Sequence, residues 1–177
     1  MTLSGTTKWT LISLGIAVIL TGYWALYTLR ISLNASASLP HNAYVLWTWP
    51  KRVTYGTIIS VPSPPAFEDT FEGLHFTKEV YGLPGDVISH APDGRVCVNG
   101  ECFALYEIDG EVFAPALPEG IIPEGRYAAF GQAGDSLDSR YEIIGLFAHE
   151  NIYAVGFGTD RIPHWTAIRD WSQGRAK

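Results

Sequence analysis

The feature that most constrains the fold is an uncharged apolar segment near the amino terminus, running from Trp9 to Leu29. It is about 21 residues long, enough to cross a hydrocarbon layer roughly 30 Å thick as a helix. A cleaved secretory signal is the alternative, but its apolar core is usually about 7 to 15 residues long and ends in small residues. Because this segment is longer and ends in Leu29-Arg30-Ile31, we predict a single transmembrane anchor, with aromatic residues suited to the membrane interfaces: Trp9, Tyr23, Trp24 and Tyr27.

The rest of the 177-residue chain has the length of one ordinary domain. We therefore expect a short cytoplasmic amino terminus over residues 1–8, the transmembrane helix over 9–29 and one folded domain over 30–177. Flanking charge does not orient the anchor, since Lys8 and the amino terminus on one side face Arg30, Lys51 and Arg52 on the other. The net charge of -6 and a pI near 5.3 argue against nucleic acid as a partner.

The domain is predicted to be mostly β, because short β-rich runs alternate with turn residues and no long stretch beyond the anchor has helical periodicity. The acidic segment Phe67–Glu72 fits a solvated connection. The tail from His164 to Lys177 carries aromatic and aliphatic residues at helix-like spacing, and it could pack on the domain or lie at the membrane interface. The predicted strands are Tyr44–Trp49, Thr57–Val61, Leu74–Tyr81, Asp86–His90, Arg95–Ala104, Arg126–Phe130 and Asn151–Phe157.

Two cysteines flank a predicted hairpin turn. Asn99-Gly100 is a strong signal for a type I′ turn, and this turn would place Cys97 directly opposite Cys102. Such a pair has Cα atoms roughly 4.5 Å apart, at the short end of disulfide geometry. A cross-strand disulfide would fit an oxidising compartment such as the periplasm, and the alternative is a pair of buried free thiols.

Serine and lysine are the residues best suited to covalent catalysis in this chain. A serine hydroxyl needs a neighbouring base, and none of the five histidines lies in a recognisable triad context. Lys78 lies in an apolar strand context that could lower its pKa by desolvation, which a lysine base requires. On the strand pattern alone, a lysine such as Lys78 is more often a solvated edge residue.

Three separated motifs agree with one family. Residues 34–40 read Asn-Ala-Ser-Ala-Ser-Leu-Pro, residues 78–86 read Lys-Glu-Val-Tyr-Gly-Leu-Pro-Gly-Asp, and residues 135–141 read Asp-Ser-Leu-Asp-Ser-Arg-Tyr. In order and spacing they resemble the nucleophile, lysine and final motifs of the type I signal peptidases with a Ser/Lys dyad. Within that family the chain resembles the short conjugative-transfer (TraF-type) branch, which matures pilins.

The resemblance implies a signal-peptidase-like β-barrel catalytic domain with Ser38 as nucleophile and Lys78 as general base. Ser36 would help to stabilise the oxyanion, and Ser136 would orient the lysine amine. Asp138 and Arg140 would form a supporting charged pair. We expect neither a metal ion nor a cofactor.

The implied function is that of a single-pass inner-membrane serine endopeptidase whose domain lies in the periplasm. Its partners would be the lipid bilayer and a substrate, a pilin or another exported precursor, which would be hydrolysed or cyclised. Glu79 and Leu39 depart from the Arg and Met that are usual in the family, which favours the specialised branch. The alternatives are a general leader peptidase and a catalytically silent, membrane-anchored peptide-binding module of a secretion apparatus.

Overall fold

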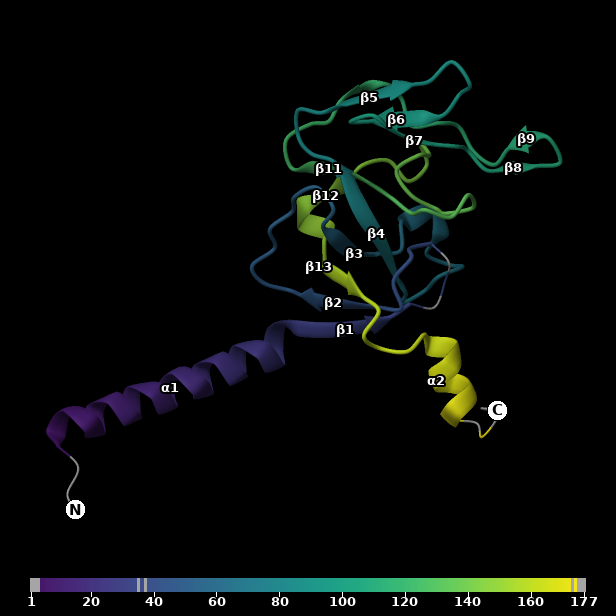
Figure 1. Cartoon of the computed structure of the whole chain (residues 1–177). Helices are drawn as coiled ribbons and strands as arrows, with labels where there is room; N and C mark the ends of the chain where they lie inside the picture. Colours follow the sequence, from purple (N-terminus) through teal and green to yellow (C-terminus); the bar gives the residue numbers. More distant parts are fainter. Residues whose placement is uncertain (1–3, 35, 37, 173, 175–177) are drawn as a thin grey trace.

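The computed structural model describes residues 4–34, 36, 38–172 and 174. A long helix, α1 (Gly5–Thr28), projects away from a β-rich domain, as Figure 1 shows. None of its residues is buried, and the Ser4 side chain caps it by accepting a hydrogen bond from the Thr7 N–H. With 24 residues and a mean hydropathy of 1.7 in its most apolar window, α1 is a candidate membrane span by length and composition. It begins four residues before the first residue of the predicted segment and ends one residue before its last residue.

The main sheet has seven strands in the order β1-β2-β13-β3-β4-β11-β12, and every neighbouring pair is antiparallel. β1 continues directly from α1 and pairs with β2 over five residues. The strands are β1 (Leu29–Leu33), β2 (Ala43–Trp47), β3 (Ile58–Pro62), β4 (His75–Gly82), β11 (Arg126–Phe130), β12 (Phe147–Ala148) and β13 (Ala154–Thr159).

A second sheet has the order β10-β5-β6-β7, and a small hairpin, β8 and β9, protrudes beside it (Figure 1). The remaining elements are two short 3₁₀ helices and a carboxy-terminal helix. Their bounds are β5 (Val87–His90), β6 (Val96–Val98), β7 (Glu101–Phe103), β8 (Glu107–Ile108), β9 (Glu111–Val112), β10 (Gly120–Ile121), η1 (Pro65–Phe67), η2 (His149–Asn151) and α2 (Trp165–Ser172).

Three groups of buried side chains form the core. One lies around Ile59 and Val155 in the main sheet, and one around Val98 and Phe130 between the two sheets. The third contains Leu39 and joins the loop after β1 to β2 and β3. Ala128 and Ala129 belong to different groups, as neighbours on a strand point to opposite faces, and the pairing of β11 with β4 shifts register between them.

Gly82 in β4 permits the close approach of the two sheets. A Cβ there would lie 2.5 Å from Ile122 Cδ1 and 2.9 Å from Ala128 Cβ. Real Cβ atoms essentially never approach that closely, so a larger residue would force these neighbours apart. The glycine therefore serves packing here rather than turn geometry.

The mostly β class with one amino-terminal apolar helix is confirmed. β1 and β12 form the edges of the main sheet, and no pairing joins them among the described residues. The described strands thus form an open sheet instead of the closed barrel that the family resemblance implied. Five of the described strands were not predicted: β1, β8, β9, β10 and β12.

The predicted turn is present in the hairpin of β6 and β7. Asn99 and Gly100 have φ angles of 51° and 84°, as a type I′ turn requires. Cys97 lies opposite Cys102 with a Cα separation of 4.1 Å, and the two sulfurs form a disulfide.

Candidate active site

The loop between β1 and β2 carries the predicted nucleophile. Leu39 is buried in the third core group, which fixes the backbone immediately after Ser38. The Ser38 carbonyl accepts a hydrogen bond of 2.6 Å from the Gln132 N–H. The Ser38 N–H donates to the Ser36 hydroxyl at 3.3 Å. Packing and backbone contacts on both sides of Ser38 thus restrain it.

The predicted base is buried at the centre of the main sheet. Lys78 lies on β4 opposite Ile59 of β3, and its side chain is only 5% exposed. Its Nζ donates to Ser136 Oγ at 2.7 Å and lies 5.6 Å from the centre of the Phe76 ring. Burial is the largest influence on this amine and lowers the pKa of Lys78 from 10.5 to about 8. At neutral pH a useful fraction of the amine is therefore unprotonated.

Nearby charges act on the same pKa in opposite directions. The carboxylates of Asp138 and Asp135 raise the pKa of Lys78, whereas the Arg140 guanidinium lowers it. Because Asp138 and Arg140 form a pair, their opposite effects partly offset one another. Desolvation consequently dominates the outcome.

The loop from Gly131 to Arg140 supplies the third predicted group. Ser136 is 2% exposed, and the Asp138 and Arg140 side chains behind it are fully buried. Arg140 Nε donates to Asp138 Oδ1 at 2.8 Å, and its Nη atoms donate to the carbonyls of Ala104, Gly131 and Gly134. A buried ion pair with this many partners satisfies its own charges and shapes the loop around Ser136.

Gly131 lies at the contact between the serine loop and the Ser136 loop. A Cβ at this position would collide with Ser136 Oγ and would approach the Ser38 carbonyl oxygen to 2.9 Å. The Gly131 N–H donates to Asp138 Oδ2 at 2.8 Å, which holds the glycine in this place. The two loops can approach one another only because residue 131 has no side chain.

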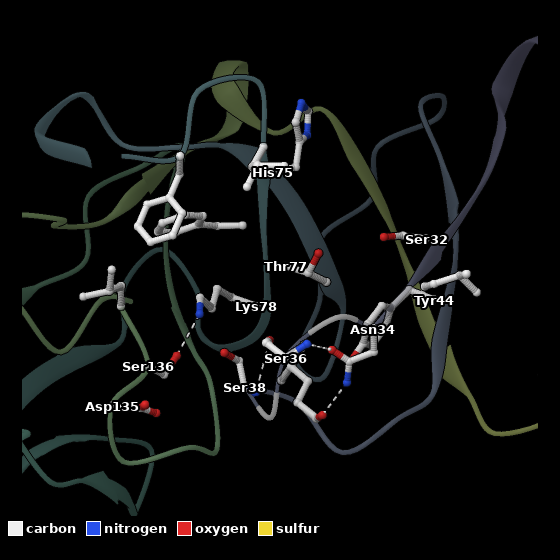
Figure 2. Close-up of a pocket in the computed structure, with 16 residues that line it drawn as sticks. Ser32, Asn34, Ser36, Ser38, Tyr44, His75, Thr77, Lys78, Asp135 and Ser136 are labelled. Atoms are coloured by element: carbon white, nitrogen blue, oxygen red, sulfur yellow. Dashed lines mark hydrogen bonds between the residues drawn. The ribbon is translucent and has the colours of Figure 1, made fainter. Parts of the chain in front are cut away.

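A cleft of about 550 Å³ brings four of the predicted residues together: Ser36, Ser38, Lys78 and Ser136. Figure 2 shows the side chains of Ser38, Lys78 and Ser136 pointing toward one another. Among the described residues, a hydrogen bond joins the Lys78 amine to Ser136 and none joins it to Ser38. Apolar side chains from the loop after η1 and from β4 form part of the wall, among them Phe71, Leu74 and Phe76.

The other predicted residues lie outside this cleft. Asp138 and Arg140 are behind Ser136 and do not line it, and the Cys97–Cys102 disulfide is in the second sheet. Within the part of the chain that the structure describes, no group of three or more His, Cys, Asp or Glu side chains could hold a metal ion.

Sequence reasoning missed three residues that shape the site: Asn34, Gly131 and Gln132. Asn34 is the first residue of the nucleophile motif, so its position was available as a signal, but no role was assigned to it. Gly131 and Gln132 are more than ninety positions from Ser38 in the sequence, and only the fold brings them into contact with it.

The arrangement suits acyl transfer. A hydroxyl in a cleft beside a buried amine of lowered pKa is what a serine nucleophile with a lysine base requires. A backbone N–H and a second hydroxyl near that serine can stabilise a developing oxyanion.

Comparison with known proteins gives three findings. The family model described as "Signal peptidase, peptidase S26" matches residues 3–165. A protein named signal peptidase I from Pseudomonas fluorescens is 29% identical over a match that covers 48% of this chain and 42% of that protein, so the chain spans less than half of that relative's length. The crystal structure of a signal peptidase I from Enterococcus faecalis V583 is 22% identical and covers 59% of this chain and 97% of its own; its TM-score of 0.37 is too low to carry an argument.

Proposed function

Because the chain belongs to the signal peptidase family S26, we propose that it is a membrane-tethered serine endopeptidase that removes signal or propeptide segments from exported precursors. The observation that carries the proposal is the buried Lys78 amine, hydrogen-bonded to Ser136 in the cleft that also contains Ser38. A lysine is rarely buried to this degree without a partner carboxylate in direct contact.

The proposed reaction begins with the neutral Lys78 amine. It takes the proton of the Ser38 hydroxyl while Ser38 Oγ attacks the scissile carbonyl carbon. The peptide carbonyl oxygen becomes an oxyanion, to which the Ser38 N–H and the Ser36 hydroxyl donate. In the free enzyme the Ser38 N–H donates to Ser36 Oγ, so the substrate oxygen would replace Ser36 as its acceptor, and the Ser36 hydroxyl would turn to donate to the same oxygen.

The second half of the reaction returns the proton. The Lys78 ammonium protonates the departing amine, the C–N bond breaks, and an ester between Ser38 and the substrate acyl group remains. Water then attacks the ester and releases an acid, or an amine of the substrate attacks it and forms a new amide. In either case Lys78 takes a proton from the attacking water or amine. The Lys78 ammonium then gives a proton to Ser38 Oγ as the ester bond breaks. Ser136 holds the amine in place throughout, since its Oγ accepts from Lys78 Nζ.

The substrate would bind as an added β-strand in the cleft, between the loop that follows β1 and strand β4. Backbone hydrogen bonds would align the scissile bond, and small residues would precede it. The outer edge of β1 is unpaired in the described sheet, which supports this mode of binding.

We place the chain in the conjugative-transfer branch of the family, with a pilin precursor as substrate. The N-x-S-x-S-x-P form of the nucleophile motif supports this branch. A general leader peptidase that acts on many exported precursors is a second candidate, which the similarity to a protein named signal peptidase I favours. Broad accumulation of precursors after depletion would favour the second candidate.

We further propose that α1 spans the inner membrane once and that residues 30–177 lie in the periplasm. The apolar composition and length of α1 support the span. The Cys97–Cys102 disulfide supports an oxidising compartment for the domain.

Co-expression with a pilin precursor from the same gene neighbourhood tests the proposal, with intact mass of the pilin as the readout. We expect the native chain to process the precursor and the Ser38→Ala and Lys78→Ala variants to leave it uncut. A product lighter by one water than the hydrolysed form would identify cyclisation. Ser63→Ala is a matched serine control, because Ser63 lines a separate cavity and not this cleft. Processing that survives Ser38→Ala would refute the nucleophile assignment.

A further inference from the structure

A single buried side chain connects both ends of the loop that carries Ser38. Asn34 is the first residue after β1 and is 7% exposed. Its Oδ1 accepts a hydrogen bond of 3.1 Å from the Ser36 N–H. Its Nδ2 donates to the Leu39 carbonyl at 2.8 Å and to the His41 carbonyl at 2.7 Å. The three bonds enclose Ser38 from both sides, and part of this network is visible in Figure 2.

The chemistry of these contacts selects an asparagine. One partner is an N–H, which can only donate, and the other two are carbonyls, which can only accept. A carboxamide offers one acceptor oxygen and two N–H donors, so it satisfies all three partners with none of its own hydrogens unused. An aspartate has the same shape but has no hydrogen to donate when it is ionised. A side chain without polar atoms would remove these three bonds and leave the carbonyl of the buried Leu39 without its Asn34 donor.

The two groups that Asn34 holds are those on which the proposed reaction depends. The bond to the Ser36 N–H fixes the residue whose hydroxyl faces the Ser38 N–H. The bond to the Leu39 carbonyl fixes the peptide group immediately after Ser38. The serine Oγ and the two oxyanion donors therefore have their relative positions set by one side chain.

Other contacts hold the base of the loop and its Ser38–Leu39 segment. The Asn34 N–H donates to the Asn42 carbonyl, which closes the base of the loop. The Tyr44 hydroxyl donates to the His41 carbonyl at 3.3 Å, and the Gln132 N–H donates to the Ser38 carbonyl. None of these contacts holds Ser36, so loss of the Asn34 amide would loosen Ser36 and its approach to the Ser38 N–H while the base of the loop stays closed.

We propose that Asn34 is a positioning residue for Ser38 and for the oxyanion donors, an inference that rests on the proposed serine peptidase function. Asn34 is among the residues that line the cleft, but its amide is engaged by the loop backbone, so it would act through Ser36 and Ser38. Its effect is to preorganise the loop, so that the nucleophile and the donors need no rearrangement during attack.

Covalent labelling of Ser38 by a serine-reactive acyl probe tests the inference on the full chain in detergent micelles, with the labelled residue identified by mass spectrometry. The maximal labelling rate and the half-saturating probe concentration are measured for the native chain, Asn34→Ala, Asn34→Asp and Ser38→Ala, well below the unfolding temperature of each. Asn99→Gly is the matched control, because Asn99 also donates twice from a well-placed amide but lies on the distant hairpin turn.

We expect both Asn34 variants to lower the maximal rate by about 100-fold, since small displacements of reacting groups have effects of that size. The half-saturating concentration should change little, because the hydrogen-bonding atoms of Asn34 are engaged by the loop backbone. Hydrogen exchange should increase in the peptide over residues 36–42 and stay unchanged in β4 and β13. Labelling of Asn34→Asp should be as slow as that of Asn34→Ala, because both variants lack the two N–H donors of the asparagine amide.

The outcomes separate the two proposals. Equal labelling of the native chain and Ser38→Ala, or no labelling of Ser38 in the native chain, overturns the proposed function and the inference with it. Rapid labelling of the native chain together with native rates in Asn34→Ala overturns the inference alone. A loss of rate in Asn99→Gly as large as in the Asn34 variants, or increased exchange across the whole domain, would show that Asn34 serves only the stability of the fold.

Discussion

Replacing Lys78 with methionine should reveal how much folding free energy the chain gives up to keep an amine in its cleft. Methionine has a similar length and no charge, so Lys78→Met removes the desolvation penalty with little change in packing volume. Burial lowers the pKa of Lys78 from 10.5 to about 8. Each pKa unit corresponds to about 1.4 kcal/mol, so this shift means that the protonated lysine destabilises the folded state by about 3 kcal/mol.

The sign of the pH dependence follows from proton counts. Below pH 8 the lysine is protonated in both the folded and the unfolded chain, and the full penalty is present. Between about pH 8 and pH 10.5 the folded chain has lost the proton while the unfolded chain retains it, so the free energy of unfolding rises with pH. Above that window both states are neutral and the penalty has disappeared.

The assay is chemical unfolding of the full chain in detergent micelles, for the native chain and Lys78→Met, from about pH 7 to about pH 11. Other titrating groups are common to both chains, so they cancel in the difference between the two free energies of unfolding. We expect the native chain to gain about 3 kcal/mol relative to Lys78→Met across this range. The loss of the bond to Ser136 adds an offset of about 1 kcal/mol to this difference. A difference that stays flat with pH would refute the assignment of a desolvated Lys78 amine.

Three further predictions follow from the same geometry. The maximal rate of Ser38 acylation should rise with pH to a half-maximal value near pH 8, because the reactive form of Lys78 is the neutral one; a profile flat from pH 6 to pH 9 would contradict a lysine base. Gly131→Ala should lower that rate by about 100-fold, because the added methyl group displaces Ser136 or the Ser38 backbone. Thermal unfolding measured in parallel should show a folded protein. A native rate in this variant would count against the close contact of Gly131 with Ser136 and Ser38. Replacing both Cys97 and Cys102 with serine should lower the free energy of unfolding by about 2 kcal/mol, the value for a short closed loop; urea unfolding under oxidising conditions measures it, and an unchanged midpoint would disprove the contribution.

Much of the fold could be predicted because its signals are local. The β6–β7 hairpin follows from Asn99-Gly100, since a type I′ turn needs positive φ at both positions. The predicted β2, β3, β4, β5, β11 and β13 appear with boundaries shifted by a few residues, because alternation and turn residues mark strands more reliably than their ends.

β1 was not predicted because its composition continues that of the apolar segment before it. Leu29–Leu33 becomes a strand through pairing with β2, a partner that a local pattern does not reveal. The β8–β9 hairpin did have a local signal in Asp109-Gly110, where both φ angles are positive, but charged flanking residues obscured it. The open sheet departs from the implied barrel for a similar reason, since the pairing of strand edges is decided over the whole fold.

The residues of the candidate site also fall into two classes, those with a local sequence signal and those that only the fold brings together. Four residues that line the cleft, Ser36, Ser38, Lys78 and Ser136, could be named from three motifs, because each motif keeps its chemistry in a short stretch. The contacts of Gly131 and Gln132 with the Ser38 backbone could not, since they arise only when β4 and β11 bring distant loops together. The role of Asn34 was also hidden, because an asparagine after a strand is common and only its buried partners distinguish it.

The direct passage from α1 into β1 would limit where the proposed peptidase can cut. No linker separates Thr28, the last helical residue, from Leu29, the first residue of the strand, and Ser38 follows Thr28 by ten positions. An extended chain covers at most about 3.6 Å per residue, so for a chain tethered through α1 the nucleophile would work within about 36 Å of the end of the span.

A precursor held in the same bilayer would then need a spacer of matching length between its own membrane segment and its scissile bond. Precursors with a suitable cleavage sequence but a shorter or longer spacer would present that sequence at the wrong height. In the proposed peptidase, the junction of helix and strand would thus select substrates by distance, in addition to selection by sequence within the cleft.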